Sequence, residues 1–166
     1  MQMEFVTELF RLAKEKGVHT TLDTAGHPFT REETWLACFR PLFDLTDLFL
    51  LDIKHVDPEK HRRLTGVGNE NILDFARYIA EHGGHMWIRH VLVPGYTDDE
   101  GDLSALRAFI DSLRGISPTA VERVEVLPYH TLGVPKYEKL GIAYRLAGVP
   151  APTADAVERA KKILCE

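Results

Sequence analysis

The chain has 166 residues, 45% apolar and 27% charged, with a formal net charge of −5. This composition is typical of a soluble globular protein, and we expect one domain over residues 1–166. No Lys/Arg run is available to neutralise phosphates, which argues against a nucleic-acid partner. No apolar run approaches the ~20 residues that cross a bilayer. Acidic residues occupy the amino-terminal positions where a signal peptide carries bases. The sequence therefore predicts a cytoplasmic protein without a membrane partner.

The amino-terminal part alternates between helical and extended patterns. Residues 3–16 carry apolar side chains at helical spacing, which predicts a helix. Residues 18–24, VHTTLDT, are rich in β-branched residues and predict a strand. A helix is predicted over residues 30–42, where Thr30 and Glu33 have the spacing of a capping box.

The rest of the chain continues this alternation. The stretch LFLLDIK, residues 48–54, lacks a polar alternation and predicts a strand buried on both faces. Further elements are predicted as helices over 57–64, 70–83, 99–115 and 153–166 and as strands over 86–95 and 122–130. A looser segment separates the last strand from the last helix. Strands that alternate with helices predict an α/β fold with a parallel sheet covered by helices.

A parallel sheet also predicts where function lies, because ligands bind beyond the carboxyl ends of its strands. The polar candidates at or near these ends are Asp23, Thr24, Asp52, Lys54, Arg89 and His130. Asp52 and Lys54 are two positions apart and therefore point to the same side of their strand. Carboxylates, an ammonium, a guanidinium and an imidazole on one rim suit a zwitterionic or cation-bearing small molecule.

Each candidate also has a simpler structural explanation. Asp23 is a common type of turn former, and Asp52 with Lys54 is compatible with a mutual surface ion pair of little energetic value. Arg89, in an apolar strand, requires a carboxylate or a ligand, so a structural pair with one of the two aspartates is an alternative. His130 is compatible with a solvated loop position.

Five segments in a fixed order carry a family resemblance: HTTLDTAG, LFLLDIKH, LTGVGNENILDFARYIA, MWIRHVLVPGYTDDEGD and VLPYHTLGVPKY. Together they resemble the pyruvate formate-lyase activating enzymes, which are radical S-adenosylmethionine glycyl-radical activases. The resemblance covers residues 3–164.

The resemblance implies a partial (β/α)6 barrel, an S-adenosylmethionine cofactor and a [4Fe-4S] cluster. The family uses the reduced cluster to generate a 5′-deoxyadenosyl radical, which abstracts hydrogen from a glycine of pyruvate formate-lyase or a related glycyl-radical enzyme. It also implies an electron donor such as flavodoxin. The cofactors carry the difficult chemistry, and the protein positions them.

Residue by residue, the resemblance implies two sites. Asp52, Lys54, Arg89 and His130 match positions that hold S-adenosylmethionine, with Lys54 suited to the methionine carboxylate. Asp23, Thr24 and Asp52 match the family's monovalent-cation site, for which oxygen ligands are suitable.

The sequence departs from the family in one respect. It contains no C-x-x-x-C-x-x-C loop, and its two cysteines, Cys38 and Cys165, do not replace three clustered thiolates. We therefore expect no iron–sulfur ligands and no catalytic residue in this chain, which resembles the carboxyl-terminal portion of an activase without the amino-terminal barrel units. We expect it to be inactive alone.

Two other functions remain open. One is a truncated, non-catalytic binding or interaction module. The other is a cluster-free α/β lyase in which Lys54, buried at a strand end, forms a Schiff base.

Overall fold

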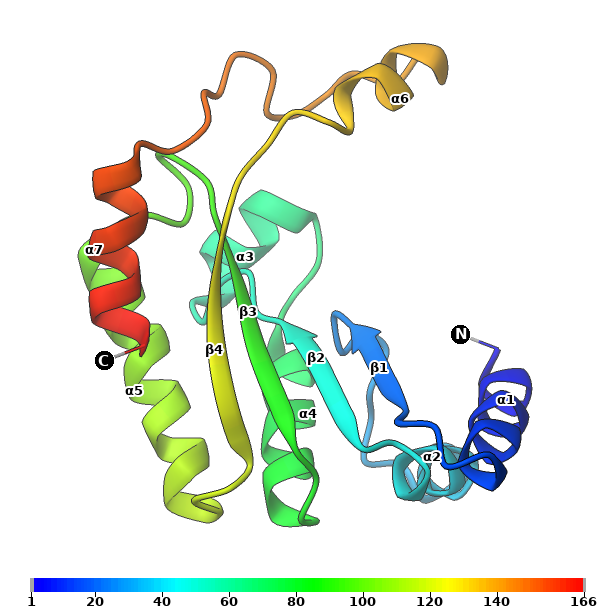
Figure 1. Cartoon of the computed structure of the whole chain (residues 1–166). Coiled ribbons are helices and arrows are strands. Elements are labelled where there is room, and N and C mark those ends of the chain that lie inside the picture. The colour runs from blue at the N-terminus through cyan, green and yellow to red at the C-terminus, as the bar shows by residue number, and fades with distance from the viewer. Residues whose placement is uncertain (1, 166) are drawn as a thin grey trace.

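A computed structural model describes residues 2–165, which build one sheet of four parallel strands. The strands follow the order β1-β2-β3-β4, so that β1 and β4 form its edges (Figure 1). The elements are, in chain order, α1 Met3–Glu15, β1 Thr21–Thr24, α2 Glu33–Asp44, β2 Leu48–Asp52, α3 Pro58–Thr65, α4 Glu70–Glu81, β3 Met86–Leu92, α5 Glu100–Ile116, β4 Val121–Pro128, α6 Val134–Lys139 and α7 Ala154–Cys165. The predicted α/β class with a parallel sheet is confirmed.

The capping box predicted for the second helix is wrong. The helix begins at Glu33, and the Thr30 hydroxyl instead accepts a hydrogen bond from the Glu32 backbone N–H at 3.3 Å. The cause is Phe29, which is only 4% exposed and whose backbone N–H closes a turn to the Gly26 carbonyl. Burial of this ring keeps Thr30 in the connection that precedes the helix.

Helix α6 lies in the segment for which no element was predicted. It has six residues, contains a proline in its first turn, and projects away from the sheet beyond the end of β4 (Figure 1). A helix this short shows too few turns for its apolar periodicity to be recognised. At the other boundary, Glu166 of the predicted last helix lies outside the described residues.

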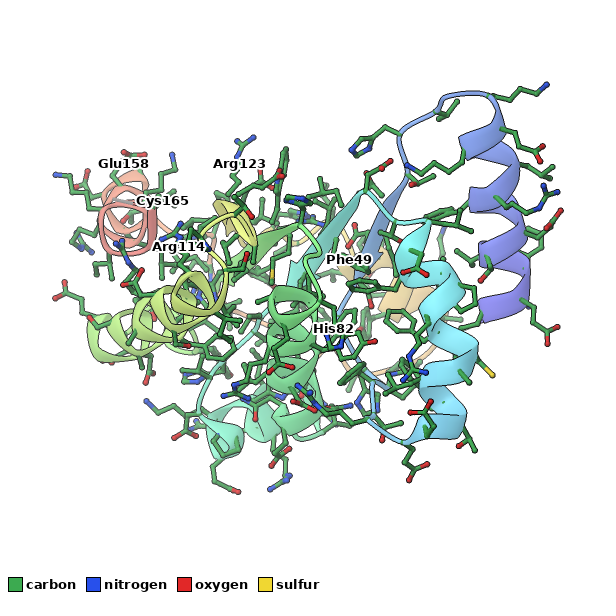
Figure 2. All side chains as sticks on the ribbon, turned by 90° about the horizontal axis from the view of Figure 1, so that it is seen from below. Phe49, His82, Arg114, Arg123, Glu158 and Cys165 are labelled. Carbon is green, nitrogen blue, oxygen red and sulfur yellow. The ribbon has the colours of Figure 1, made fainter. Side chains whose placement is uncertain are left out.

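Helices cover one face of the sheet. Helices α4 and α5 lie behind the strands in Figure 1 and below them in Figure 2, and within residues 2–165 no helix lies over the opposite face, which we call the open face. Strand β3 reflects this asymmetry, because Ile88 is fully buried whereas its neighbours Trp87 and Arg89 are half-buried. The prediction that β2 is buried on both faces is wrong for Leu50 and Asp52, which are half-buried.

Asp47 connects three elements at the start of β2. Its carboxylate pairs with the Lys14 ammonium of α1 and accepts a 2.7 Å hydrogen bond from the Thr20 backbone N–H, which immediately precedes β1. The hydrogen bonds from Lys14 and Thr20 lower the pKa of Asp47 to about 2. This carboxylate therefore helps to hold α1 and the edge strand in place.

Candidate functional site

The sheet register brings three charged residues into one row. Arg89 of β3 lies opposite Asp52 of β2 on one side and Glu125 of β4 on the other. Neighbouring parallel strands lie about 4.8 Å apart, and residues in register point to the same face. The row therefore crosses the open face close to the carboxyl end of β2.

Asp52 and Lys54 form an ion pair where β2 ends. The Lys54 Nζ donates to Asp52 Oδ2 at 2.9 Å, and the two side chains are 29% and 23% exposed. Where β2 leaves the sheet, its last backbone hydrogen bond to β3 runs from the Ile53 N–H to the Arg89 carbonyl, at 3.0 Å. The expected placement of both side chains on one side of the strand is therefore observed.

The Arg89 guanidinium lies between two carboxylates. Its Nη1 donates to Asp23 Oδ2 at 2.8 Å, and its Nε is 4.0 Å from Asp52 Oδ1. The structure thus brings together Asp23, Asp52, Lys54 and Arg89, four of the six predicted site residues, from three strands or their ends.

Two polar atoms of this group lack hydrogen bonds. Asp52 Oδ1 and Arg89 Nε are buried and have no hydrogen-bond partner among the described residues. Leaving such atoms unpaired costs free energy, so their presence favours a site that is completed by a ligand. One atom accepts and the other donates, which fits a ligand that carries both a donor and an acceptor.

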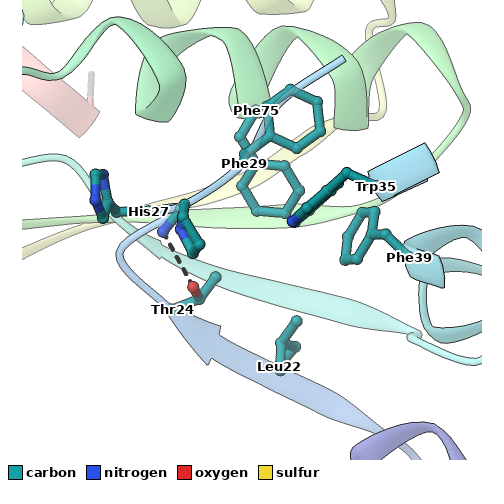
Figure 3. Close-up of a pocket in the computed structure, with 9 residues that line it drawn as sticks. Leu22, Thr24, His27, Phe29, Trp35, Phe39 and Phe75 are labelled. Carbon is teal, nitrogen blue, oxygen red and sulfur yellow. Dashed lines mark hydrogen bonds between the residues drawn. The ribbon is translucent and has the colours of Figure 1, made fainter. Parts of the chain in front are cut away.

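Thr24 lies on the other face of β1. Its hydroxyl accepts a 3.0 Å hydrogen bond from the Gly26 backbone N–H, and its side chain lines a small pocket with Phe29 and Trp35 (Figure 3). The Thr24 side chain therefore points away from that of Asp23. Of the three predicted cation ligands, Asp23 and Asp52 flank Arg89, and Thr24 lines this pocket.

His130 follows β4 and is exposed. Within residues 2–165 its ring makes no hydrogen bond or ion pair, whereas the preceding Tyr129 is buried and donates from its backbone N–H to the Leu92 carbonyl at 3.1 Å. The structure does not bring His130 into contact with the group around Arg89. Its assignment to the site stays a prediction.

Glu125 is a residue of the row that sequence reasoning missed. Its side chain is 23% exposed and lies 3.1 Å from the Arg123 guanidinium, which in turn stacks 4.8 Å from the centre of the Trp87 ring. Residues 123–126, RVEV, alternate between charged and apolar side chains, and this alternation is the signal that could have identified Glu125. The pairing of Glu125 with Arg89 cannot be predicted from the sequence, because the register between β3 and β4 shifts between Met86 and Trp87.

The described residues do not fit an iron–sulfur cluster. Cys38 lies on α2, near the β1 edge of the sheet, and Cys165 lies at the end of α7, near the β4 edge (Figures 1 and 2). Residues 2–165 contain no group of three or more His, Cys, Asp or Glu side chains that could hold a metal ion.

None of the helices in the described part of the chain is both long and apolar enough to cross a membrane. The Schiff-base alternative required Lys54 to be buried, whereas its ammonium is ion-paired and its side chain is 29% exposed.

Comparison with protein families and sequences gives a consistent result. Residues 1–106 match the model of the radical SAM superfamily. The chain is 48% identical over 164 residues to the pyruvate formate-lyase-activating enzyme of Streptococcus mutans serotype c, covering 99% of this chain and 60% of that protein. It is 50% identical over 160 residues to the enzyme of the same name from Staphylococcus aureus strain USA300, covering 96% and 62%. The chain thus spans about three fifths of the length of these relatives.

Solved structures agree on the fold. A domain of pyruvate-formate lyase-activating enzyme from Bacteroides vulgatus ATCC 8482 superposes with a TM-score of 0.75 at 23% identity, covering 98% of this chain and 85% of that one. Streptococcus suis SuiB, crystallised with S-adenosylmethionine, gives a TM-score of 0.65 at 17% identity, covering 96% and 32%. The family resemblance predicted from five sequence segments is confirmed.

Proposed function

This chain belongs to the radical SAM superfamily, and we propose that the open face of its sheet binds S-adenosylmethionine at the carboxyl ends of β2 and β3. The observation that carries the proposal is the pair of buried atoms without hydrogen bonds, Asp52 Oδ1 and Arg89 Nε. They are a donor and an acceptor 4.0 Å apart, and a ligand that reaches them would supply the hydrogen-bond partners that they lack. SuiB, which shares the fold, was crystallised with the same cofactor.

Each side chain has a distinct role in this proposal. The Lys54 ammonium has three N–H donors, so it can keep its bond to Asp52 and also bind the methionine carboxylate. Arg89 supplies a second cationic donor, and its guanidinium lies between Asp23 and Asp52. Asp52 Oδ1 accepts from a donor group of the ligand. His130, on the loop after β4, is a further contributor that the ligand reaches at the rim.

The reaction proposed for the whole protein is supported by the names of its relatives. We propose that the chain is part of an activating enzyme for pyruvate formate-lyase or a related glycyl-radical enzyme, because relatives at 48% and 50% identity carry that name. In such an enzyme S-adenosylmethionine supplies the radical that removes hydrogen from a glycine. The residues of this chain would bind and orient that cofactor.

The remaining parts of the proposal concern partners and a cation. A reducing protein such as flavodoxin is the proposed electron donor of the complete enzyme. A monovalent cation beside Asp23 and Asp52 would require the Arg89 guanidinium to move aside, because it lies between these carboxylates. A measured dependence of S-adenosylmethionine affinity on potassium concentration, at constant ionic strength, tests the cation.

Isothermal titration calorimetry of S-adenosylmethionine into the chain tests the site. We expect Lys54→Ala to weaken binding by about tenfold or more, because charge-assisted hydrogen bonds contribute roughly 1.5–3 kcal/mol. Lys161→Ala is a matched control, since it also removes a lysine that pairs with a carboxylate at 2.8 Å, on α7. Equal affinity in the wild type and Lys54→Ala would remove the site assignment.

A further inference from the structure

The segment that follows β2 is held by buried side chains rather than by strand pairing. Residues 53–57 leave the sheet after the bond from the Ile53 N–H to the Arg89 carbonyl. Beyond this point the backbone carbonyls of Ile53, His55 and Val56 all face side chains of other elements. Lys54 lies within this segment, between two residues whose carbonyls are held.

Asn69 holds the far side of the segment. It precedes α4 and is only 1% exposed. Its Nδ2 donates to the His55 carbonyl at 2.7 Å and to the Val56 carbonyl at 3.0 Å. A side-chain amide has two N–H donors, so both are used on this one stretch of backbone.

His90 holds the near side. It is 3% exposed and points to the helix-covered face of β3, opposite to Arg89. Its Nδ1 lies 3.0 Å from the Ile53 carbonyl and its Nε2 lies 3.1 Å from the Thr97 carbonyl. Burial lowers the pKa of His90, which favours a neutral ring, and the tautomer with its single N–H on Nδ1 donates to the Ile53 carbonyl.

His55 completes the arrangement from within the segment. Its Nδ1 accepts a hydrogen bond from the Asp57 backbone N–H at 3.0 Å, and its Nε2 lies 3.1 Å from Asp102 Oδ2. Burial of Asp102 acts to raise its pKa, but hydrogen bonds from Lys60 and His55 outweigh this effect and lower the pKa. The segment is therefore tied to α5 as well.

From these contacts we infer that Asn69 and His90 are positioning residues that fix the backbone of Lys54 so that its ammonium meets the carboxylate of S-adenosylmethionine. The inference rests on the proposed function. A lysine side chain is long and flexible, and its attachment point determines where its ammonium is concentrated. Ordering that point before the ligand arrives reduces the entropy lost on binding.

A pair of ligands distinguishes positioning from general support of the fold. S-adenosylmethionine carries the carboxylate that Lys54 is proposed to bind, whereas 5′-methylthioadenosine has the same nucleoside and sulfur but no aminocarboxypropyl chain. We expect Asn69→Ala and His90→Phe each to weaken S-adenosylmethionine binding by about tenfold. A displaced Lys54 ammonium would lose its hydrogen bond to the ligand carboxylate, and a hydrogen bond to a charged group is worth roughly this much. Affinity for 5′-methylthioadenosine should change by less than about twofold.

His61→Phe is the matched control. His61 is 2% exposed, and its Nδ1 contacts the Val67 carbonyl at 2.9 Å, so it is a buried histidine that holds a different turn. This variant is expected to lower stability without changing the ratio of the two affinities. Circular dichroism identifies any variant that does not fold. If one of Asn69→Ala and His90→Phe does not fold, the test is made with the other.

The outcomes separate the inference from the function on which it rests. If Lys54→Ala changes the affinity ratio but Asn69→Ala and His90→Phe do not, the positioning role is overturned and the site stands. If the ratio is the same in the wild type and Lys54→Ala, or if the wild type binds neither ligand, the proposed site and the positioning role are both overturned. Faster amide hydrogen exchange at residues 54–57 in the folded Asn69 and His90 variants, with unchanged exchange in β3, is expected alongside the loss of affinity.

Discussion

Replacement of Arg89 by methionine separates a ligand-binding role from a structural one. Methionine retains the apolar contacts of the arginine stem and removes only the guanidinium. We expect the Arg89→Met variant to bind S-adenosylmethionine at least about tenfold more weakly, because charge-assisted hydrogen bonds contribute roughly 1.5–3 kcal/mol. We expect its free energy of unfolding to change by less than about 1 kcal/mol.

The small effect on stability follows from the geometry of the two ion pairs. The Asp23 side chain that receives the 2.8 Å bond is 61% exposed, and ion pairs with exposed partners contribute about 0–1 kcal/mol. The second pair, to Asp52, is at 4.0 Å and includes no hydrogen bond. Without Arg89, Asp52 keeps its 2.9 Å contact with Lys54.

Urea unfolding followed by circular dichroism gives the stability change, and titration calorimetry in the same buffer gives the affinity. Arg123→Met is the control, because it removes a second cation from the open face, one row away from Asp52. A loss of more than about 3 kcal/mol together with unchanged affinity for S-adenosylmethionine would show that Arg89 is a structural ion-pair residue and would refute the reasoning.

Three further predictions concern stability. Gly26→Ala should cost about 1–3 kcal/mol in urea unfolding, because Gly26 has φ +76° and an added Cβ would lie 3.2 Å from Leu51 Cδ1. Asp47→Asn should cost roughly 1 kcal/mol near pH 6, after allowance for solvent screening, and only a small fraction of that near pH 2. The hydrogen bond from Lys14 lowers the pKa of Asp47 to about 2, so its contribution is lost progressively as pH falls from the unfolded value of about 3.9 through this folded value. Burial lowers the pKa of His90, so below about pH 6.5 the unfolded chain binds more protons than the folded one and the free energy of unfolding should fall. The fall should be less steep in His90→Phe. Unfolding measured at pH 7.5 and 5.5 gives the two slopes.

Each stability prediction has a contrary result. Gly17→Ala, at φ +67° with open space around the added Cβ, is the control for Gly26→Ala, and an equal cost at both positions would show that backbone strain alone is responsible. An Asp47→Asn deficit that persists unchanged at pH 2 would exclude the ion pair as its cause. An identical pH slope in the wild type and His90→Phe would exclude titration of that histidine.

The sequence was sufficient where one physical pattern dominated. Strand β2 was recognised from its apolar run, and the side-by-side placement of Asp52 and Lys54 followed from the two-residue period of a strand. Four of the six predicted site residues meet because parallel strands align their carboxyl ends.

The rest depended on tertiary contacts that local patterns do not contain. The start of α2 is set by burial of Phe29, which a capping rule for Thr30 does not include. The opposite orientations of Asp23 and Thr24 follow from strand alternation, but the sequence did not indicate which face is covered by helices. The role of Asn69 required knowledge that α4 begins beside the exit of β2.

Binding of S-adenosylmethionine to the chain and to Lys54→Ala, with 5′-methylthioadenosine measured in parallel, is the most direct test of the central claim. We predict that the wild-type chain prefers the ligand with the carboxylate and that Lys54→Ala loses about tenfold or more of that preference. An unaltered preference in Lys54→Ala would contradict the account, because the ammonium at the end of β2 would then not contact the ligand.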